Sequence, residues 1–501
     1  MREVDLPTSW TTVPIDEVLS PLADGRLLHQ GWSPQCDSTP AQPGEWGVLK
    51  TTAVQAGWFE EVHNKRLPDT LTPKQELEVK AGDILLTCAG PRARCGVATL
   101  VRHTRPRLIL SGKMYRFRAD PRIIDPRYLE HFLISPTVQT AIDQMKTGIS
   151  DSGLNLTHAR FNTLQISLAP LPEQERIVSE LERRLSHVDA AQASLTLAAK
   201  RVALVKSSLV DAAVSGRLLE SAESISIPHL QDVIGLSTDS FARGRWRSVP
   251  AAHVVDAPPH WESARLADLA WDAGYGTSVK CGPTLSNTPV LRIPNVTSNG
   301  VDLSDMKYAP DGQVPVDLTL KAEDLLFVRT NGSRRVIGRS TLAKKAVGMS
   351  FASYLIRFRL VRDPLVAQWV ALVVSAPSIR SELVRKASNS AGQFNLGLAD
   401  IAGISIPFPP REEMEIILLE VDRRMSLVVA AESVIEANVS KCGQIRRSLL
   451  AASFAGNLVP QDPDDEPAEV LLERVRVARA ATQDTPAPRR RASRVKKEAT
   501  A

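Results

Sequence analysis

The longest uninterrupted helical pattern in the chain runs from Pro172 to Leu218 and reads PEQERIVSELERRLSHVDAAQASLTLAAKRVALVKSSLVDAAVSGRL. No proline follows Pro172 in it and no glycine precedes Gly216, as expected for the first turn and the end of one helix. Apolar residues recur at every seventh position, namely Leu181, Val188, Leu195, Val202 and Leu209. This period predicts a coiled-coil helix, and about 45 residues make a rod of roughly 65 Å.

A second rod repeats the first without a gap, since Gly456 stands 240 positions after Gly216 and each apolar position has a counterpart. A long helix with an apolar stripe is unstable alone in water, so the simplest partner for each rod is the other one. We predict that the helices pack through Ile177, Leu181, Val188, Leu195, Val202, Leu209, Ile417, Val421, Val428, Ile435 and Leu449. A second row of positions, four residues before each position of the first row, includes Arg184 and Arg424. Charged residues there indicate either that the row fixes the alignment of the two helices or that it contacts another protein in part.

Composition limits the class of protein. The chain has 501 residues, of which 43% are hydrophobic and 23% charged, enough for two or three globular domains. It has no apolar run long enough to span a membrane and no signal-peptide pattern, and its five cysteines form no C-x-x-C pair, so we expect a cytoplasmic protein with reduced thiols. A net charge of +5 is compatible with nucleic-acid binding.

Two globular regions of similar pattern precede the rods. Residues 82–86 and 115–118 recur at 323–327 and 356–359, an offset of 241, among short β-like runs and Gly/Pro turns. The β-like runs repeat but the loops between them differ. We therefore predict an internal duplication in which the strands are repeated and the connecting loops are variable. The predicted parts are a first sheet-rich domain (1–155), a first rod (156–218), a connector (219–256), a second sheet-rich domain (257–395), a second rod (396–458), and an acidic turn, short helix and basic disordered tail (459–501).

The sequence contains no recognisable catalytic motif. It has neither a G-x-x-x-x-G-K-[ST] nor a G-x-G-x-x-G motif, and the N/D-P-P-Y/F tetrapeptide of amino-methyltransferases is absent. The nine histidines do not pair at metal-ligand spacing, and no base is visible near Cys88 or Cys95. We therefore predict no catalytic residue, no metal site and no cofactor in this chain.

Basic loops occupy matching places in the two globular regions. Thr87–Gly96 and Arg329–Arg339 each follow a predicted strand and combine glycine with several arginines, which can pair with guanine or neutralise phosphate. One such loop alone is more often a solvated loop, but two at equivalent places favour DNA contact. A polar loop before each rod, 147–152 or 388–393, is either a phosphate contact or a plain turn. The predicted DNA-binding residues are Arg92, Arg94, Ser150, Ser152, Arg329, Asn331, Arg334, Arg335, Arg339 and Gln393.

At this point the whole chain resembles the specificity subunits of type I restriction–modification systems. The most specific feature is the rod with its lead-in, residues 168–178, together with the rod ends at 209–218 and 449–458. The second lead-in, residues 406–415, departs from the family form because Met414 stands where the first copy has Gln174.

The resemblance implies an α+β chain with two target-recognition domains and two long antiparallel coiled-coil helices that act as a spacer. Its partners would be double-stranded DNA, two modification subunits carrying S-adenosylmethionine, and restriction subunits that use ATP and Mg²⁺. Such readers reach two half-sites about a helical turn apart, and because their loops differ here, the site should be asymmetric. The alternatives are a DNA-recognition subunit of another defence methylation complex and a non-enzymatic scaffold that binds proteins.

Overall fold

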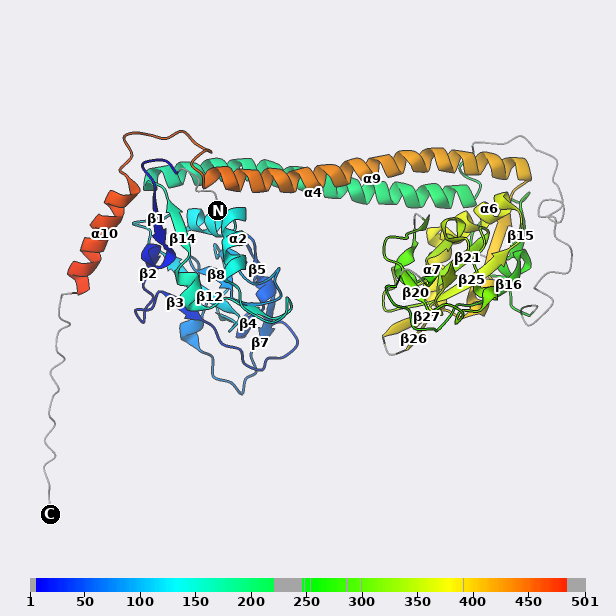
Figure 1. The fold of residues 1–501 in the computed structure, drawn as a ribbon, viewed down its shortest axis with the longest axis horizontal. Coiled ribbons are helices and arrows are strands. Elements are labelled where there is room, and N and C mark those ends of the chain that lie inside the picture. The colour runs from blue at the N-terminus through cyan, green and yellow to red at the C-terminus, as the bar shows by residue number, and fades with distance from the viewer. Residues whose placement is uncertain are drawn as a thin grey trace, which may run out of the picture. The chain divides into compact units, whose positions relative to one another are not determined.

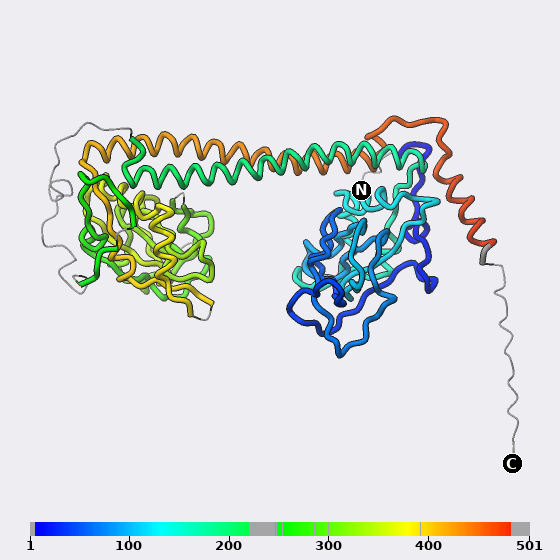
Figure 2. The backbone as a smooth tube through the Cα atoms, turned by 180° about the vertical axis from the view of Figure 1, so that it is seen from behind, coloured from blue at the N-terminus to red at the C-terminus, as the bar shows by residue number. Residues whose placement is uncertain are grey.

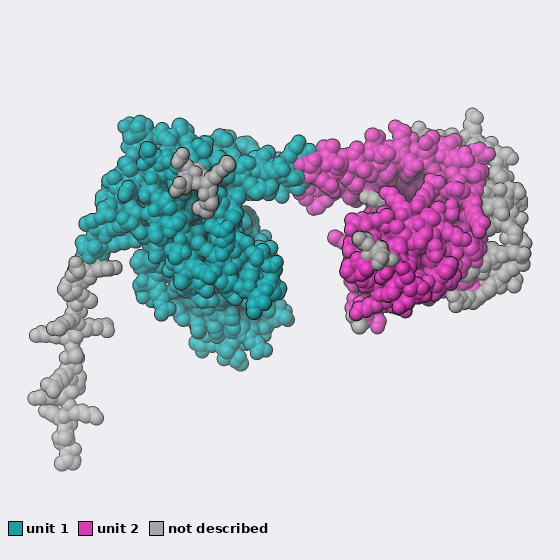
Figure 3. All heavy atoms as spheres, in the orientation of Figure 1, with its two compact units in different colours: residues 1–194, 438–501 teal, residues 195–437 magenta. Residues whose placement is uncertain are grey.

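The computed structural model describes residues 6–219, 246, 248–252, 254–284, 287–298, 300–390 and 392–483. The chain divides into two compact units: unit 1 consists of residues 1–194 and 438–501, and unit 2 of residues 195–437 (Figure 3). Most of the predicted connector and the basic tail lie outside the described residues. Each unit joins one globular region to part of both long helices.

The two predicted rods are the helices α4 (Leu171–Val214) and α9 (Arg411–Ser453), which lie side by side in both ribbon and tube views (Figures 1 and 2). Within unit 1, Leu181 and Leu185 of α4 pack on Leu450 of α9, and Asp189 pairs with Arg446, so the helices run antiparallel. Within unit 2, Lys206 Nζ lies 3.5 Å from Glu432 Oε1. The predicted α+β class with two long antiparallel helices is confirmed.

Burial along the helices separates the two heptad rows. The first row is buried at Leu181, Val188, Leu209, Val421 and Val428, and half-buried at Leu195, Val202, Ile435 and Leu449. The second row is buried where it begins, at Ile177 and Ile417, half-buried at Ala198, Ala212, Ala431, Asn438 and Ala452, and exposed at Arg184, Ala191, Val205, Arg424 and Ile445. Two helices cover only a narrow stripe of each other, so part of the second row is left on the surface.

Each globular region is built on an antiparallel central sheet. In unit 1 the strand order is β10 (Ala98–Leu100), β8 (Ile84–Thr87), β12 (Met114–Ala119) and β2 (Leu19–Ser20), with β3 (Leu28–Gln30) also paired to β12. In unit 2 the order is β23 (Ser340–Leu342), β21 (Asp324–Val328), β25 (Leu355–Leu360) and β16 (Ala270–Tyr275). The predicted runs at 83–87, 113–118, 323–327 and 356–359 are these central strands.

A smaller sheet in each unit combines one parallel and one antiparallel strand pair. In unit 1, β4 (Gly47–Leu49) runs parallel to β11 (Leu108–Ile109) and antiparallel to β7 (Asn64–Arg66). In unit 2, β17 (Thr288–Leu291) runs parallel to β24 (Ser350–Phe351) and antiparallel to β20 (Lys307–Ala309). A strand pair that opens and closes each region is also repeated: β1 (Thr11–Pro14) with β14 (Gln165–Leu168), and β15 (Glu262–Arg265) with β28 (Ser405–Phe408). This shared topology confirms the internal duplication.

Short helices cover the sheets and begin in the same way in both units. α1 (Pro126–Leu133) starts at a proline after Asp125, whose carboxylate accepts from the N–H of Arg127 at 2.7 Å. α6 (Pro364–Ser375) starts at a proline after Asp363, which accepts from Leu365 N–H at 2.9 Å. Proline at the first helical position and aspartate before it satisfy the free amides of a helix start. α2 (Pro136–Met145) and α7 (Pro377–Lys386) follow.

Each globular region is joined to the helices by two contacts of the same kind. Trp10 donates its indole N–H to Glu173 at the start of α4, and Trp261 donates to Glu413 at the start of α9. At the opposite ends of the helices, Gly216 and Gly456 both have φ near +72°, and a Cβ there would lie within 2.5 Å of Pro258 or Pro7. Glycine is therefore required where each helix ends against the opening of a globular region.

The predicted C-terminal helix is α10 (Ala468–Gln483). Its residues Ala468, Leu472 and Val475 belong to the main core of unit 1, and Arg479 donates to the Asp120 carboxylate at 2.7 Å. Among the described residues, no helix has the length and apolar character needed to cross a membrane.

Candidate nucleic-acid interface

In unit 2 the two predicted loops are brought together by a small sheet. β22 (Thr330–Asn331), which begins the arginine-rich loop, pairs with β27 (Gln393–Asn395), and β27 pairs with β26 (Ser388–Ser390). The hydroxyl of Thr330 also donates to Gln393 Oε1 at 3.4 Å, across 63 positions of sequence. The polar loop before α9 and the basic loop after β21 therefore form one continuous surface.

Unit 1 repeats this arrangement. β9 (Ala89–Gly90) pairs with β13 (Leu154–Asn155), and Thr147 bridges to Asn155 as β26 does to β27. The N–H of Arg92 donates to the Asp151 carbonyl at 2.8 Å, which fastens the basic loop to the polar one. The same two loops thus meet in both units, although their sequences differ.

Aromatic rings hold two of the predicted arginines of unit 2. The guanidinium carbon of Arg329 lies 4.5 Å from the centre of the Tyr275 ring, and that of Arg334 lies 5.1 Å from the centre of the Phe394 ring. Such cation–π contacts fix a guanidinium in place without neutralising its charge. Both arginines therefore keep the full positive charge that contact with phosphates or guanine needs.

The other predicted residues of unit 2 lie along the same loops. Arg335 is exposed, and Arg339 donates to the carbonyl of Val296 at 3.1 Å. Asn331 accepts from the Ser333 N–H at 2.8 Å and shapes the turn, while Gln393 is exposed on the hairpin. The exposed residues can contact a ligand, and Arg339 and Asn331 hold the loop.

The two arginines of unit 1 have different surroundings. Arg94 donates to the carbonyls of Thr51 and Val54 and to Gln55 Oε1, which ties the loop to the preceding turn. Arg92 is half exposed and pairs with Asp143 at 2.6 Å and Asp151 at 3.0 Å. The hydrogen bond that Arg92 donates to Asp151, followed by the charge of Asp143, raises the pKa of Arg92. Arg94 is suited to hold the loop, and Arg92 to reach outward from it.

The polar loop of unit 1 ends in an exposed apolar tip. Ile149 is fully exposed, and the hydroxyls of Ser150 and Ser152 beside it lie 2.9 Å apart. Gly148 has φ of +151°, and a Cβ there would lie 2.7 Å from the carbonyl oxygen of Gly153, so only glycine fits this tight turn. The tight turn therefore holds the Ile149 side chain outward, away from the core.

Strand register identifies contact positions that the sequence did not reveal. On the central sheets, Gln30 faces Tyr115 and Tyr275 faces Ile356, while the N–H of Cys88 bonds to Lys113 and that of Arg329 to Tyr354. Because Tyr115 and Ile356 are equivalent strand positions, Tyr275, Arg329 and Tyr354 of unit 2 correspond to Gln30, Cys88 and Lys113 of unit 1. Tyr275, Tyr354 and Lys113 are all exposed. The sequence pointed towards these residues only through the repeated β-runs, and those runs stopped short of Tyr275, Tyr354 and Lys113.

The described residues include no group of three or more His, Cys, Asp or Glu side chains that could hold a metal ion. Burial, followed by the nearby Cys95, raises the pKa of the Cys88 thiol to about 12, so this thiol is protonated at neutral pH and is a poor nucleophile. The loops are equipped with charged, amide and aromatic groups, which suit binding.

The long helices offer a second surface, of apolar character. The exposed large apolar residues on them are Leu197, Leu204, Val205, Ile416, Leu419, Leu427, Val429, Val434, Val439 and Ile445. Exposed apolar side chains gathered along one pair of helices are typical of a protein–protein contact.

Comparison with known proteins agrees with these features. No protein-family model matches the chain. The specificity subunit of the type I restriction enzyme EcoKI of Escherichia coli (strain K12) is 24% identical over 455 residues, 89% of this chain and 91% of that protein. The EcoEI specificity subunit of Escherichia coli is 33% identical over 216 residues, so the match spans 43% of this chain and 35% of that relative.

A solved structure described as showing complex assembly and conformational transition of a type I restriction–modification system has the same fold. It aligns with a TM-score of 0.61 at 18% identity, over 90% of this chain and 99% of that one. The chain is similar in sequence to the specificity subunits of type I restriction enzymes and shares its fold with that solved structure, in agreement with the resemblance predicted from the sequence.

Proposed function

We propose that this chain is the DNA-specificity subunit of a type I restriction–modification complex and reads a split, asymmetric site with one unit per half-site. One observation supports this function above others. In both units the basic loop meets the polar loop on strands of the same topology, but the side chains on the loops differ. Unit 2 has Arg329 stacked on Tyr275 where unit 1 has the buried Cys88 near Gln30. Two readers of equal shape and different chemistry suit two different half-sites.

Contacts to DNA would come from the exposed members of each surface. In unit 1 these are Arg92, Lys113, Ser150, Ser152 and the tip residue Ile149. In unit 2 they are the exposed Tyr275, Arg334, Arg335, Tyr354 and Gln393, together with the half-buried Arg329. Arginine can read guanine or neutralise phosphate, tyrosine can donate to either, and isoleucine can pack on a thymine methyl group. Arg94, Arg339 and Asn331 would act by holding their loops in shape.

The exposed apolar residues of α4 and α9 would dock two modification subunits, one for each unit. These subunits would carry S-adenosylmethionine, and restriction subunits that use ATP and Mg²⁺ would join them. The chain itself would hold no cofactor and would work in the cytoplasm, where its DNA substrate is. The sequence supports this division because no nucleotide- or methyl-donor motif occurs in it.

The test is to co-express the full chain with the modification subunits of its system and to map methylated bases in the host genome. We expect methylation at one split, asymmetric motif, and none when this chain is omitted. The purified chain alone should transfer no label from S-adenosylmethionine to plasmid DNA. A symmetric or unsplit motif, or methylation by the isolated chain, would contradict the proposal.

A further inference from the structure

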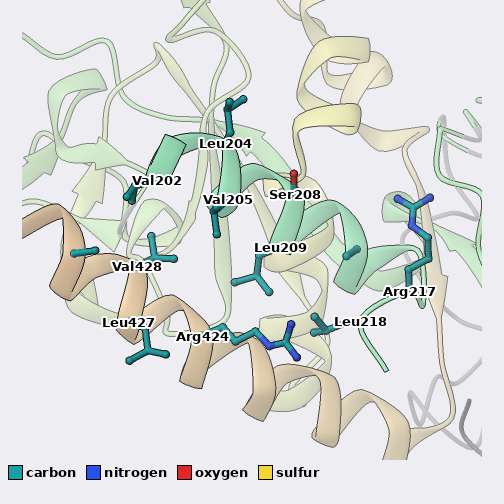
Figure 4. A pocket seen from close by; sticks show the side chains of 12 residues that line it. Val202, Leu204, Val205, Ser208, Leu209, Arg217, Leu218, Arg424, Leu427 and Val428 are labelled. Atoms are coloured by element: carbon teal, nitrogen blue, oxygen red, sulfur yellow. The ribbon is translucent and has the colours of Figure 1, made fainter. Parts of the chain in front are cut away.

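Two exposed surfaces of unit 2 have opposite character. The groove between α4 and α9 is lined mostly by apolar side chains, among them Leu204 and Leu427 (Figure 4). The basic loop and the helix α7 beside it instead gather arginines: Arg334 and Arg335 are exposed, and Arg380 is half-buried. The Arg380 guanidinium donates to the carbonyl of Arg335 at 2.8 Å, so the helix and the loop are in direct contact.

These three arginines keep their positive charge uncompensated. Within the described part of unit 2 none of them forms an ion pair, and the acidic residue of α7, Glu382, pairs with Arg385 and Lys386. Burial, followed by the charge of Arg339, lowers the pKa of Arg380, so its surroundings disfavour the charged guanidinium. An anion at this place would relieve the repulsion between like charges and accept charge-assisted hydrogen bonds.

The basic loops of the two units correspond residue by residue. Each contains a turn in which the N–H groups three and four positions on donate to one carbonyl, that of Pro91 in unit 1 and that of Ser333 in unit 2. Arg92 therefore corresponds to Arg334. The next residue is Ala93 in unit 1 but an arginine in unit 2.

The helices beside these loops correspond as well. α2 and α7 each have 10 residues, and each packs against the glycine at the end of its basic loop. Counted from the first residue of each helix, Gln139 takes the place of Arg380, and Asp143 takes the place of Val384. Unit 1 thus has an amide where unit 2 has a cation, and a carboxylate where unit 2 has an apolar side chain.

The equivalent arginines Arg92 and Arg334 are consequently held by opposite chemistry. Arg92 pairs with Asp143 at 2.6 Å and with Asp151 at 3.0 Å, whereas the Arg334 guanidinium lies over an aromatic ring. The polar loop of unit 2, residues 388–393, contains no acidic residue. The charge of Arg92 is compensated inside unit 1, and that of Arg334 is available to a ligand.

We propose that unit 2, through Arg334, Arg335 and Arg380, supplies the sequence-independent attraction of this chain to DNA phosphate. Unit 1 adds little to it, because its two carboxylates withhold Arg92. The inference rests on the function proposed above. Each phosphate contact steepens the fall of log K with log salt concentration by about 0.9, whereas an arginine that must first leave two carboxylates loses its ion pairs when it binds phosphate. Unit 2 therefore meets DNA of any sequence, and Arg92 engages only where its half-site offers a better contact.

The test measures binding of the assembled methyltransferase to two duplexes, one with the methylated motif and one with both half-sites scrambled, between about 50 and 200 mM salt. The salt slope is the slope of log K against log salt concentration. On the scrambled duplex, Arg334→Ala should reduce this slope by about 0.9 and weaken binding severalfold. The matched change Arg92→Ala should leave both unchanged on that duplex and weaken binding to the motif only.

Further variants test α7 and the carboxylates. Arg380→Gln, which introduces the unit 1 residue, should reduce the salt slope by about 0.9 on both duplexes, and Arg380→Lys should retain most of it. Asp143→Asn/Asp151→Asn should steepen the slope on the scrambled duplex by about 0.9, because it releases the unit 1 arginine. Arg385→Ala, on the same helix but paired with a carboxylate, is the control and should change the slope much less. Thermal unfolding checks that each variant is folded.

Distinct outcomes separate the inference from the function it rests on. If Arg334→Ala and Arg92→Ala change the slope on the scrambled duplex equally, or if neither changes it, the division between the units is wrong although DNA recognition stands. If Arg380→Gln alters one base of the methylated motif and not the slope, the assignment to phosphate is overturned. If poly-glutamate competes as well as scrambled duplex of equal charge, the cluster binds an acidic protein surface and the inference is wrong. If the wild-type complex binds neither duplex, the proposed function itself fails.

Discussion

The guanidinium carbon of Arg329 lies 4.5 Å from the centre of the Tyr275 ring, at the end of the central sheet of unit 2. The equivalent residues of unit 1 are Cys88 and Gln30, and there the Gln30 amide nitrogen lies 3.9 Å from the Cys88 sulfur. One backbone frame therefore carries a stacked cation in one unit and a neutral amide in the other. The two units therefore differ in charge at this pair of positions.

Replacing Arg329 by alanine should alter one half of the methylated motif only. A base-reading arginine contributes about 1–3 kcal/mol, so recognition should weaken roughly 5- to 150-fold and become less selective at one base. Tyr275→Leu should have a smaller effect in the same half, because the guanidinium loses its stacking partner. Motif mapping in the assembled methyltransferase measures both.

The control for these variants is Arg385→Ala, which removes an exposed arginine paired with Glu382 on α7 of the same unit. It should leave the motif unchanged. If Arg329→Ala instead weakens binding to all sequences alike and lowers its salt dependence, the residue contacts phosphate and not a base. An unchanged motif and affinity would remove Arg329 from the interface.

Arg94 and Arg92 should respond in opposite ways to replacement by alanine. Arg94→Ala removes hydrogen bonds to two backbone carbonyls, including that of Val54 at 2.6 Å, and should lower the free energy of unfolding of unit 1 by about 1.5–3 kcal/mol. Arg92→Ala removes only exposed ion pairs, which contribute about 0–1 kcal/mol, and should change DNA binding more than stability. Denaturant unfolding and motif mapping separate the two effects. Equal loss of stability in both variants would contradict this division.

The periodicity of apolar residues predicted the long helices well. It could not predict which side chains contact each other when the residues are far apart in the sequence. The rods follow from the seven-residue period, and the central strands follow from short apolar runs. The role of Arg94 depends on carbonyls about 40 positions away, which no local pattern encodes. Likewise, β3 and β16 have weak strand patterns in the sequence. Only the pairing of these strands in the structure identified Gln30 and Tyr275 as equivalent positions near the predicted loops.

The salt bridge between Arg479 and Asp120 should make the packing of α10 on unit 1 weaker at acid pH. Burial by itself raises the pKa of Asp120, but hydrogen bonds from Arg122 and Arg479 outweigh it and lower the pKa from 3.8 to about 2. Because the pKa is lowered in the folded state, the carboxylate stabilises the fold above about pH 4, and this contribution is lost as pH falls towards 2.

Arg479→Met should therefore increase hydrogen exchange of α10 at pH 7 and weaken the pH dependence of unfolding between pH 4 and 2. Arg476→Met, on the same helix, removes an exposed pair with Glu17 and should change both measurements much less. If α10 exchanges at the wild-type rate in the Arg479 variant, its apolar contacts alone hold it.

Ile149 should contribute to recognition through its apolar surface. It is fully exposed at the tip of a loop that Gly148 forces into a tight turn, and the loop adjoins Arg92 through Asp151. In the matching hairpin of unit 2, the strands Ser388–Ser390 and Gln393–Asn395 have no aliphatic side chain, so this contact would belong to one half-site. An isoleucine can pack on the methyl group of thymine, which distinguishes thymine from cytosine in the major groove.

Ile149→Ala should relax selectivity at one base of the unit 1 half-site, with a loss of about 1 kcal/mol or more in DNA-binding free energy and no loss of thermal stability. Val62→Ala, an equally apolar change at another exposed site of unit 1, should have no effect on the motif. A variant that methylates the wild-type motif at the wild-type rate would place this loop away from the DNA.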